Sequence, residues 1–351
     1  MHDSFIIGLD DRILVTGAVG FIGTRVVEAL LDRGFSNIAC FTRPSSRVTA
    51  IEGFARDHAS RCRINVFKGN LLSRPDCEAA CDGAAVIFHL AAGTGEKSFP
   101  DAFMNSVVAT RNVLEASLRC ASLKRFVLVS SFAVYSNHQR SRHLDESCPV
   151  EQNPELRGDA YCFAKVKQEE LLTSCAKEFC VPYVIVRPGT VYGAGKSQIT
   201  GRVGLRTFGV FLHLGGSNKI PFTHVDNCAE AIVLAGLVKG VEGEVFNVVD
   251  DDLPSSRQFL SQYKQNVTPF RSVYVPHPVS YALCSIWEKY SRWSGGQLPP
   301  IFNRRRWQAE WKKTSYTNAK LKERLGWAPK VPTKEALRLY FDGCEQRGEH
   351  A

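Results

Sequence analysis

A tyrosine and a lysine four residues apart form the pattern in this chain that is best suited to acid–base chemistry. Tyr161 and Lys165 fall in residues 160–177, where the apolar spacing predicts a helix, so the two side chains share one helical face. A free phenol has a pKa of about 10 and is a poor base at neutral pH. A neighbouring ammonium favours the phenolate and brings the group into acid–base range. The spacing therefore predicts Tyr161 as an acid/base and Lys165 as its partner.

Two serines follow the apolar run 125–129 and supply hydroxyls for the same chemistry. Ser130 or Ser131, at the end of a predicted strand, can hydrogen-bond a substrate alcohol or carbonyl. A Tyr-x-x-x-Lys pair alone is common on helices, where most such pairs are solvated. The pair is informative here because the serines and a glycine-rich turn precede it in the same chain.

The glycine-rich turn lies in residues 12–23, which read as a short apolar strand, a turn and the start of a helix. Gly17 can turn where a Cβ would clash, Gly20 lets the backbone approach phosphate oxygens, and Gly23 lets the helix pack close to its strand. The helix N-terminus then offers N–H groups and a positive dipole to an anion. An ordinary tight turn is the alternative, but the flanking strand and helix favour a site for a dinucleotide pyrophosphate.

The residue that contacts the adenosine ribose in such a site lies about twenty residues beyond the turn. Here it is Arg43, with no acid in reach and with Ser45, Ser46 and Arg47 beside it. Because arginine suits a 2′-phosphate, NADP(H) is favoured and NAD(H) is the alternative. In that alternative Arg43 stacks on adenine or lies at the surface.

Two further strand ends fit the same site. Asn70 follows the run 63–67 and can face the adenine amino group. Residues 90–93 are small enough for backbone to lie along the cofactor. His89 stands among apolar residues, so we expect a core histidine rather than a catalytic one.

The elements that must position these residues alternate along the first half of the chain. Strand-like runs are separated by segments of helical periodicity, among them 21–33 and 106–119. This alternation predicts an α/β fold, a doubly wound parallel sheet of the Rossmann type, which binds ligands at the carboxyl ends of its strands. The strand-like runs are 12–16, 37–42, 63–67, 85–90, 125–130 and 182–187.

Beyond Pro188 the pattern loosens into stretches rich in glycine and proline, which indicates a smaller C-terminal substrate-binding lobe. We predict a dinucleotide-binding Rossmann domain over residues 10–190 and the substrate-binding lobe over 191–345. Residues 222–250 are expected to return to the main sheet through a strand at 244–249.

Composition limits the class of protein. With 351 residues, 44% hydrophobic and 23% charged, the chain can bury a full core. It has no signal-peptide pattern and no run near the roughly 20 apolar residues of a membrane span, so we expect a cytoplasmic protein without an integral membrane segment.

The 12 cysteines are scattered without a C-x-x-C pair, so we expect reduced thiols and no metal site. The net charge of +9 is dispersed, so no nucleic-acid partner is predicted, and a homodimer stays open.

In this order the motifs resemble the extended short-chain dehydrogenase/reductase superfamily, in particular its NAD(P)-dependent epimerase/dehydratase group, over nearly the whole chain. The matching segments are 16–23, 89–92, Asn105 with 110–116, 130–135, Tyr161 with Lys165, 187–193, 224–227 and 325–329. The resemblance implies Ser131, rather than Ser130, as the substrate-orienting hydroxyl, Tyr161 as the acid/base, and Lys165 as its partner and a ribose ligand. It also implies that residues 188–191 line the nicotinamide pocket. Together with the residues above, the expected cofactor contacts are Gly17, Gly20, Phe21, Ile22, Gly23, Arg43, Asn70, Leu71, Leu90, Ala91, Ala92, Lys165, Pro188 and Val191.

Departures from the group's patterns narrow the activity. Sugar-nucleotide 4,6-dehydratases of this group carry an Asp-Glu pair after the strand-end hydroxyl, where this chain has Phe132-Ala133. Its sugar 4-epimerases carry an acid at the second strand end, which Arg43 contradicts. Segments 187–193 and 224–227 look more like the 3β-hydroxysteroid dehydrogenase and dihydroflavonol reductase branches.

The leading prediction is an NAD(P)-dependent oxidoreductase that interconverts a secondary alcohol and a ketone by hydride transfer. The alternatives are a nucleotide-sugar epimerase or reductase with bound NAD, and a non-catalytic NADP-sensing protein.

Two features stay open. The three arginines at 304–306 can clamp a nucleotide-sugar pyrophosphate or form a solvated rim. A helical stripe can be a lid over an apolar substrate, a weak membrane-surface contact or, as we expect, a core-facing stripe. The stripe consists of Val279, Ala282, Leu283, Ile286 and Tyr290.

Overall fold

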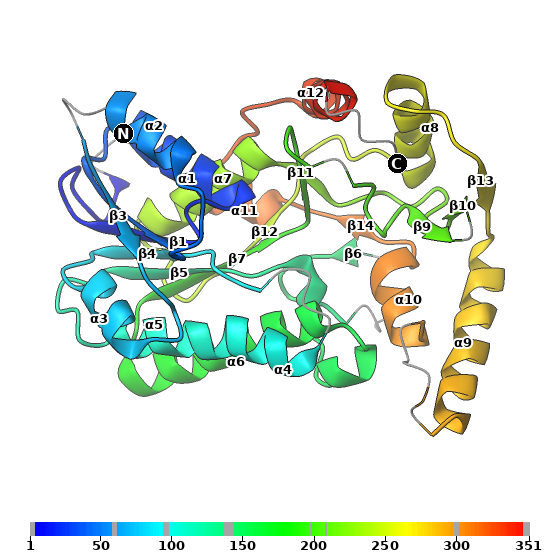
Figure 1. Cartoon of the computed structure of the whole chain (residues 1–351), viewed down its shortest axis with the longest axis horizontal. Helices are drawn as coiled ribbons and strands as arrows, with labels where there is room; N and C mark the ends of the chain where they lie inside the picture. The colour runs from blue at the N-terminus through cyan, green and yellow to red at the C-terminus, as the bar shows by residue number, and fades with distance from the viewer. Residues whose placement is uncertain are drawn as a thin grey trace.

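A parallel sheet forms the centre of the protein. The computed structural model describes residues 4–57, 62–93, 98–136, 143–196, 198–207, 209–295, 297 and 302–346. Within these ranges the main sheet has seven strands in the order β12-β7-β5-β4-β1-β2-β3, and every neighbouring pair is parallel (Figure 1). The strands are β1 Ile13–Thr16, β2 Asn37–Thr42, β3 Arg63–Lys68, β4 Val86–His89, β5 Arg125–Val129, β7 Tyr183–Pro188 and β12 Val245–Val248.

Helices cover both faces of this sheet, so the predicted doubly wound fold is confirmed (Figure 1). One face carries α1 Phe21–Asp32, α2 Thr49–Asp57, α7 Val225–Leu237 and α11 Ala319–Leu325. The other carries α3 Arg74–Cys81, α4 Phe99–Ala102, the π-helical turn η2 Phe103–Val108, α5 Ala109–Ser117 and α6 Ala160–Phe179. The helix expected over 106–119 is therefore divided between η2 and α5.

Side chains of the central strands alternate between two apolar cores. In β1, Ile13 and Val15 enter one core while Leu14 enters the other, and Phe88 and Ile87 divide in the same way in β4. All five are buried. Because a strand covered on both faces has no solvent side, it reads as a continuous apolar run, which is why these strands were visible in the sequence.

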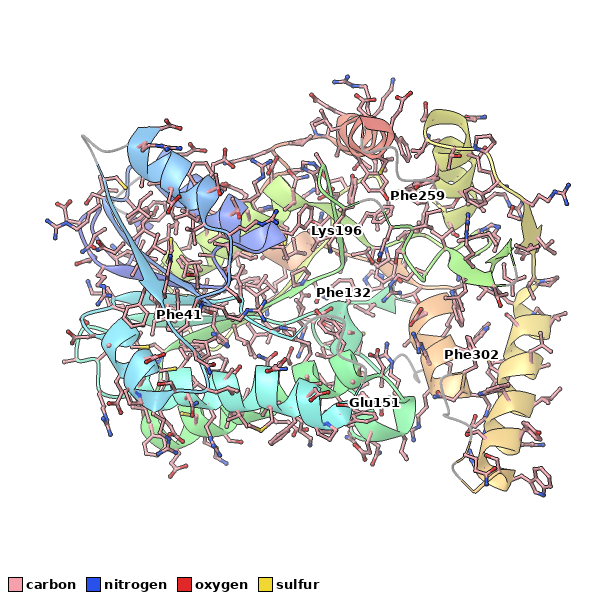
Figure 2. The ribbon with its side chains drawn as sticks, in the orientation of Figure 1. Phe41, Phe132, Glu151, Lys196, Phe259 and Phe302 are labelled. Atoms are coloured by element: carbon pink, nitrogen blue, oxygen red, sulfur yellow. The ribbon has the colours of Figure 1, made fainter. Side chains whose placement is uncertain are left out.

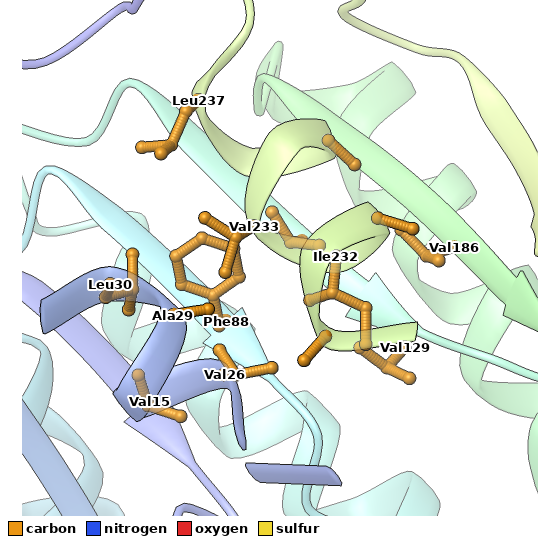
Figure 3. Packing of buried hydrophobic residues seen from close by; sticks show 14 of the residues in the cluster. Val15, Val26, Ala29, Leu30, Phe88, Val129, Val186, Ile232, Val233 and Leu237 are labelled. Atoms are coloured by element: carbon orange, nitrogen blue, oxygen red, sulfur yellow. The ribbon is translucent and has the colours of Figure 1, made fainter. Parts of the chain in front are cut away.

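The first of these cores packs α1 and α7 side by side on the sheet. Figure 3 shows Val26 and Leu30 of α1 and Val233 of α7 gathered around Phe88. Each of these side chains is fully buried. This packing fixes the direction of α1, and with it the position of the glycine turn at its N-terminus.

The remaining elements form a smaller lobe and the connections to it. A three-stranded sheet, β13-β10-β9, packs with several helices around aromatic residues that include Phe259, Tyr263 and Phe341 (Figure 2 labels Phe259). The intervening β12 lies in the main sheet beside β7. The domain bounds 10–190 and 191–345 stay predictions. The elements are η3 Phe132–Val134, β6 His143–Leu144, η4 Pro154–Arg157, β8 Thr190–Tyr192, β9 Gly204–Thr207, β10 Val210–His213, β11 Phe222–His224, α8 Ser256–Asn266, β13 Ser272–Tyr274, α9 His277–Trp293, α10 Arg304–Trp311, β14 Ser315–Tyr316 and α12 Thr333–Gln346.

Three general features follow from the residues that the structure describes. No helix among them is long and apolar enough to cross a membrane. They contain no group of His, Cys, Asp and Glu side chains that could hold a metal ion. All twelve cysteines lie in the described ranges as free thiols.

Candidate functional site

The three predicted catalytic side chains come from the end of β5 and the start of α6. Ser131 follows β5 and precedes η3. Asp159 caps α6 by accepting hydrogen bonds from the backbone N–H groups of Tyr161, at 3.1 Å, and Cys162, at 3.3 Å. The cap fixes the first turn of α6, and Tyr161 is the second residue of that helix. The fold therefore places Tyr161 near the carboxyl edge of the parallel sheet.

Lys165 is buried, with 4% of its side chain exposed, and it reaches from α6 to the strand end. Its Nζ donates to the carbonyl oxygen of Val129 at 2.7 Å and lies 5.9 Å from the centre of the Tyr161 ring. Burial lowers the pKa of Lys165 to about 8, against the opposing effect of Glu169. The amine stays mostly protonated at neutral pH, and it loses its proton more readily than an exposed lysine.

The pKa of Tyr161 is raised, which corrects the lowered value that the sequence predicted. Burial disfavours the phenolate and outweighs the hydrogen bond with Ser131, which lowers the pKa. Lys165 directs its ammonium to the Val129 carbonyl rather than to the phenol. The resting site thus holds Tyr161 as a neutral phenol, a proton donor.

The two serines have different surroundings. The hydroxyl of Ser130 is buried and donates to Glu169. Ser131 is only partly buried, its Oγ accepts from the backbone N–H of Ala133 at 3.2 Å, and it hydrogen-bonds Tyr161. Only Ser131 stands where a substrate oxygen could meet both its hydroxyl and the phenol.

Behind these residues lies a buried polar network that the sequence reasoning missed. Arg187 of β7 donates to both carboxylate oxygens of Glu169, from Nε at 2.9 Å and from Nη2 at 2.6 Å. Its Nη1 donates to the Tyr135 hydroxyl at 3.0 Å, and that hydroxyl donates to Oδ1 of Asn247 at 2.7 Å. All four side chains are buried. The network joins α6, β7 and β12 directly behind the lysine.

A signal for this network was present in the sequence. Glu169 follows Lys165 by four residues, as Lys165 follows Tyr161, so all three share one face of α6. Three polar side chains in line on a helix that covers a buried sheet must all be satisfied by partners in the core. What the sequence could not supply was the partner, because Arg187 lies on a different strand.

The glycine turn, called the glycine cradle below, is packed too closely for side chains at Gly17 and Gly23. Gly17 has φ +72°, and a Cβ there would lie 3.0 Å from the backbone nitrogen of Ala91. A Cβ on Gly23 would lie 2.1 Å from the carbonyl oxygen of Gly17. Gly20 is the N-cap residue of α1, whose first turn contains no acidic residue. The cradle fits a pyrophosphate, because the N-terminus of α1 has no side-chain cap and offers N–H groups and a dipole that favour an anion.

The other predicted cofactor residues are distributed around this cradle. Leu90, Ala91 and Ala92 follow β4, next to β1 in the sheet, and Phe21 and Ile22 begin α1. Pro188 ends β7, and Val191 lies in β8. A further cation that the sequence reasoning missed, Lys196, holds its Nζ 5.1 Å above the ring of Phe21 (Lys196 is labelled in Figure 2).

The residues assigned to adenosine lie at the ends of β2 and β3. Arg43 directly follows β2 and is exposed. Asn70 is also exposed, and its Oδ1 accepts from the backbone N–H of Leu72 at 3.0 Å, which leaves its NH₂ group for other contacts. The carbonyl of Leu71 accepts from Asn112 at 2.9 Å. These groups share one rim, and Arg43 is the charged group among them.

His89 is a core histidine, as expected from the sequence. Its Nδ1 lies 2.8 Å from the Thr16 hydroxyl and its Nε2 lies 2.9 Å from the Thr110 hydroxyl. Burial lowers the pKa of His89 to about 3. The ring is therefore neutral and holds the end of β4 to β1 and α5.

The arginines at 304–306 are held in ion pairs within the protein. Arg304 pairs with Glu288 at 3.0 Å, Arg305 with Glu151 at 2.8 Å, and Arg306 with Glu310 at 3.1 Å. Each guanidinium already has a carboxylate partner. The structure therefore favours the alternative of a rim of surface arginines over a clamp for a pyrophosphate.

The parallel sheet with helices on both faces places the chain among the Rossmann-type α/β proteins. A model of the family described as NAD dependent epimerase/dehydratase matches residues 13–248. The chain belongs to this family, which confirms the resemblance found in the sequence.

Among curated proteins, the chain is similar to 3beta-hydroxysteroid-dehydrogenase/decarboxylase isoform 1 of Arabidopsis thaliana. The two are 24% identical, over 94% of this chain and 78% of that protein. It is also 28% identical to cinnamoyl-CoA reductase 2 of Medicago truncatula, over 66% of this chain and 70% of that protein.

Among solved structures, the chain is similar to UDP-glucuronic acid 4-epimerase from Bacillus cereus in complex with UDP-glucuronic acid and NAD. The TM-score is 0.69 at 22% identity, over 96% of this chain and 99% of that chain. At this identity the likeness shows a shared fold.

Proposed function

We propose that the chain is a cytoplasmic NAD(P)-dependent oxidoreductase that interconverts a secondary alcohol and a ketone on a small molecule. The observation that carries the proposal is the meeting of Ser131, Tyr161 and Lys165 at the carboxyl end of β5. The glycine cradle lies at the same edge of the sheet, which is where such folds bind ligands.

In the reducing direction, Tyr161 donates its phenolic proton to the carbonyl oxygen of the substrate, and Ser131 donates a hydrogen bond to the same oxygen. The raised pKa of Tyr161 keeps this proton in place until the oxygen gains charge. In the oxidising direction the alcohol proton returns to the phenolate. A nicotinamide cofactor, when bound, supplies the hydride acceptor or donor. Lys165 keeps a positive charge beside the ring of Tyr161, which stabilises the phenolate when it forms.

A substitution of the phenol tests this assignment. Tyr161→Phe should lower turnover by roughly 10²–10⁴-fold, because that is the usual contribution of a positioned acid/base. Binding of NADPH, followed by fluorescence, should not change. Tyr183→Phe is the matched control, because Tyr183 begins β7, at the opposite edge of the sheet. Parental turnover in Tyr161→Phe would show that the acid/base assignment is wrong.

The second candidate is a nucleotide-sugar epimerase or reductase with bound NAD, favoured by the likeness to the Bacillus cereus enzyme. Two observations argue against the epimerase. The arginines at 304–306 are ion-paired, and position 43 carries an arginine in place of an acid. Mass spectrometry of ligand released from freshly purified protein separates the two. Stoichiometric NAD together with binding of UDP would favour the epimerase.

A non-catalytic NADP-sensing protein is the third candidate, and the complete Ser131, Tyr161 and Lys165 set argues against it. Screening the protein with NADPH against ketones, steroids and nucleotide sugars identifies the substrate class. Turnover of none of them would favour the sensor.

A further inference from the structure

Helix α9 exposes a continuous apolar stripe. Its members follow one another at spacings of four, three, four and three residues, so they lie on one side of the helix. Their exposed fractions run from 48% to 80%, so the expectation of a core-facing stripe was wrong. The α9 stripe consists of Val279 (48%), Leu283 (56%), Ile286 (63%), Tyr290 (50%) and Trp293 (80%).

The side of α9 that faces the protein combines small and polar residues with aromatic contacts. Ser280, Cys284 and Ser291 are buried. Nε1 of Trp307 in α10 donates to the Ser280 hydroxyl at 2.9 Å. Phe302, labelled in Figure 2, packs edge-on against Trp287 with ring centres 6.2 Å apart. These contacts anchor the helix without its stripe, and packing among the residues that the structure describes does not explain the stripe.

The edge of the molecule that carries α9 is cationic as well as apolar. Helix α8, strand β13 and helix α9 follow one another down this edge (Figure 1). Residues 256–293 contain five basic side chains and one acidic one. The acidic one, Glu288, is 15% exposed and is paired with Arg292 and Arg304. The basic ones are Arg257, Lys264, Arg271, Lys289 and Arg292.

We propose that this edge docks on the surface of an anionic lipid bilayer, with the α9 stripe at the boundary between headgroups and acyl chains. A helix that lies in a membrane surface combines apolar residues with Lys and Arg, and Tyr and Trp prefer the interface. In α9, Tyr290 and Trp293 stack with ring centres 5.7 Å apart at the end of the stripe. Lys289 adjoins the stripe and is exposed, where it can meet anionic headgroups.

Charge also separates this occupant from a second copy of the chain. A symmetric dimer through α9 would bring the same basic edge of both copies together, and like charges would oppose it. An anionic bilayer instead neutralises that edge. The proposal stands independently of the oxidoreductase chemistry, because none of its residues belongs to the Tyr161 site.

The test is co-sedimentation of the full chain with vesicles of phosphatidylcholine alone or mixed with phosphatidylserine. The chain should bind the mixed vesicles, and binding should weaken as salt rises. Leu283→Glu should reduce binding by roughly tenfold or more, because it removes an exposed apolar side chain that the bilayer would bury and adds a charge of the wrong sign. Phe179→Glu is the matched control, because Phe179 is 53% exposed at the far end of α6, and it should bind like the parent.

A second variant keeps the proposal testable if Leu283→Glu folds poorly. Lys289→Glu leaves every apolar side chain in place and should still weaken binding to the anionic vesicles. Three outcomes would overturn the proposal. One is absence of sedimentation with anionic vesicles, and another is equal loss in Phe179→Glu. The third is a concentration-dependent dimer that Leu283→Glu abolishes, which would make the stripe an interface between copies.

Discussion

Helices α6 and α9 both depart from the usual amphipathic pattern, in opposite directions. Helix α6 has 20 residues and buries Lys165, Gln168 and Glu169 against the sheet. Helix α9 has 17 residues and turns several large apolar side chains, Ile286 and Trp293 among them, to solvent. Burying charged side chains in α6 and exposing apolar ones in α9 each costs free energy, so packing alone does not explain either helix.

The two exceptions differ in what satisfies them. The buried charges of α6 have partners inside the chain, above all Arg187 for Glu169 and the Val129 carbonyl for Lys165. The α9 stripe is exposed among the residues that the structure describes, and we propose that an anionic bilayer covers it. Helix α6 at the proposed catalytic site and helix α9 at the proposed docking surface thus both depart from the rule that apolar side chains are buried and charged ones exposed, but for different reasons.

The largest expected effect comes from breaking the buried ion pair of α6. Glu169→Ala leaves the Arg187 guanidinium buried without its carboxylate and should lower the free energy of unfolding by about 3–5 kcal/mol. Urea denaturation followed by circular dichroism measures the loss. Glu170→Ala is the control, because its carboxylate is 51% exposed and pairs with Lys167 on the surface. It should cost no more than about 1 kcal/mol. Equal losses in the two variants would remove the distinction between buried and exposed charges on α6.

Arg43 offers a contrast to the buried charges of α6. Its guanidinium is exposed, and we expect it to bind a ligand. If the guanidinium binds a 2′-phosphate, a charge-assisted hydrogen bond of about 1.5–3 kcal/mol should favour NADPH over NADH by roughly ten- to a hundredfold. Arg43→Ala should remove most of that preference without changing NADH binding. Fluorescence titration with both cofactors is the measurement, and Arg56→Ala is the control, because Arg56 is an exposed arginine in the last turn of α2. Equal affinities in the parent would return the cofactor to NAD(H).

The buried ammonium of α6 should appear in the pH dependence of stability. The pKa of Lys165 falls from 10.5 to about 8 on folding, so the unfolded chain binds more protons between these values. Stability contributed by this group therefore rises with pH above 8, by roughly 1–2 kcal/mol up to pH 9.5. Lys165→Met should lose this rise. Urea midpoints for the parent and the variant at several pH values isolate it, and parallel curves would contradict the burial of a charged Lys165.

The smallest expected effect comes from the α9 stripe. Ile286→Ala should change the free energy of unfolding by no more than about 0.5 kcal/mol, because the side chain is largely exposed. The matched substitution Ile232→Ala, on the buried face of α7, should cost about 2–5 kcal/mol. Thermal or urea unfolding of both variants makes the comparison. A large loss in Ile286→Ala would mean that the stripe is packed in solution, and the contrast between α6 and α9 would fail.

Much of the fold followed from local patterns. The strands β1 to β5 and β7 were predicted from strand-like runs, most of which are apolar because buried parallel strands have no solvent side, whereas β6 was not predicted. Helices α1 and α6 were predicted because their apolar spacing lies within one segment. The glycine turn was visible for the same reason, since the conformation of Gly17 and the close approach of Gly23 are local requirements. Contacts between segments far apart in the chain could not be predicted from the sequence in the same way. The Glu169–Arg187 ion pair is the main example.

The sequence by itself determined the class of fold, the family and the positions of Ser131, Tyr161 and Lys165 in the chain, because each depends on local patterns and on their order along the chain. Only the tertiary structure decided what those elements face. It turned the α9 stripe outward, paired the arginines at 304–306 with carboxylates, and raised the pKa of Tyr161 by burial. The physical reason is that periodicity shows that a helix has an apolar face, whereas burial and charge pairing depend on residues far away in the chain.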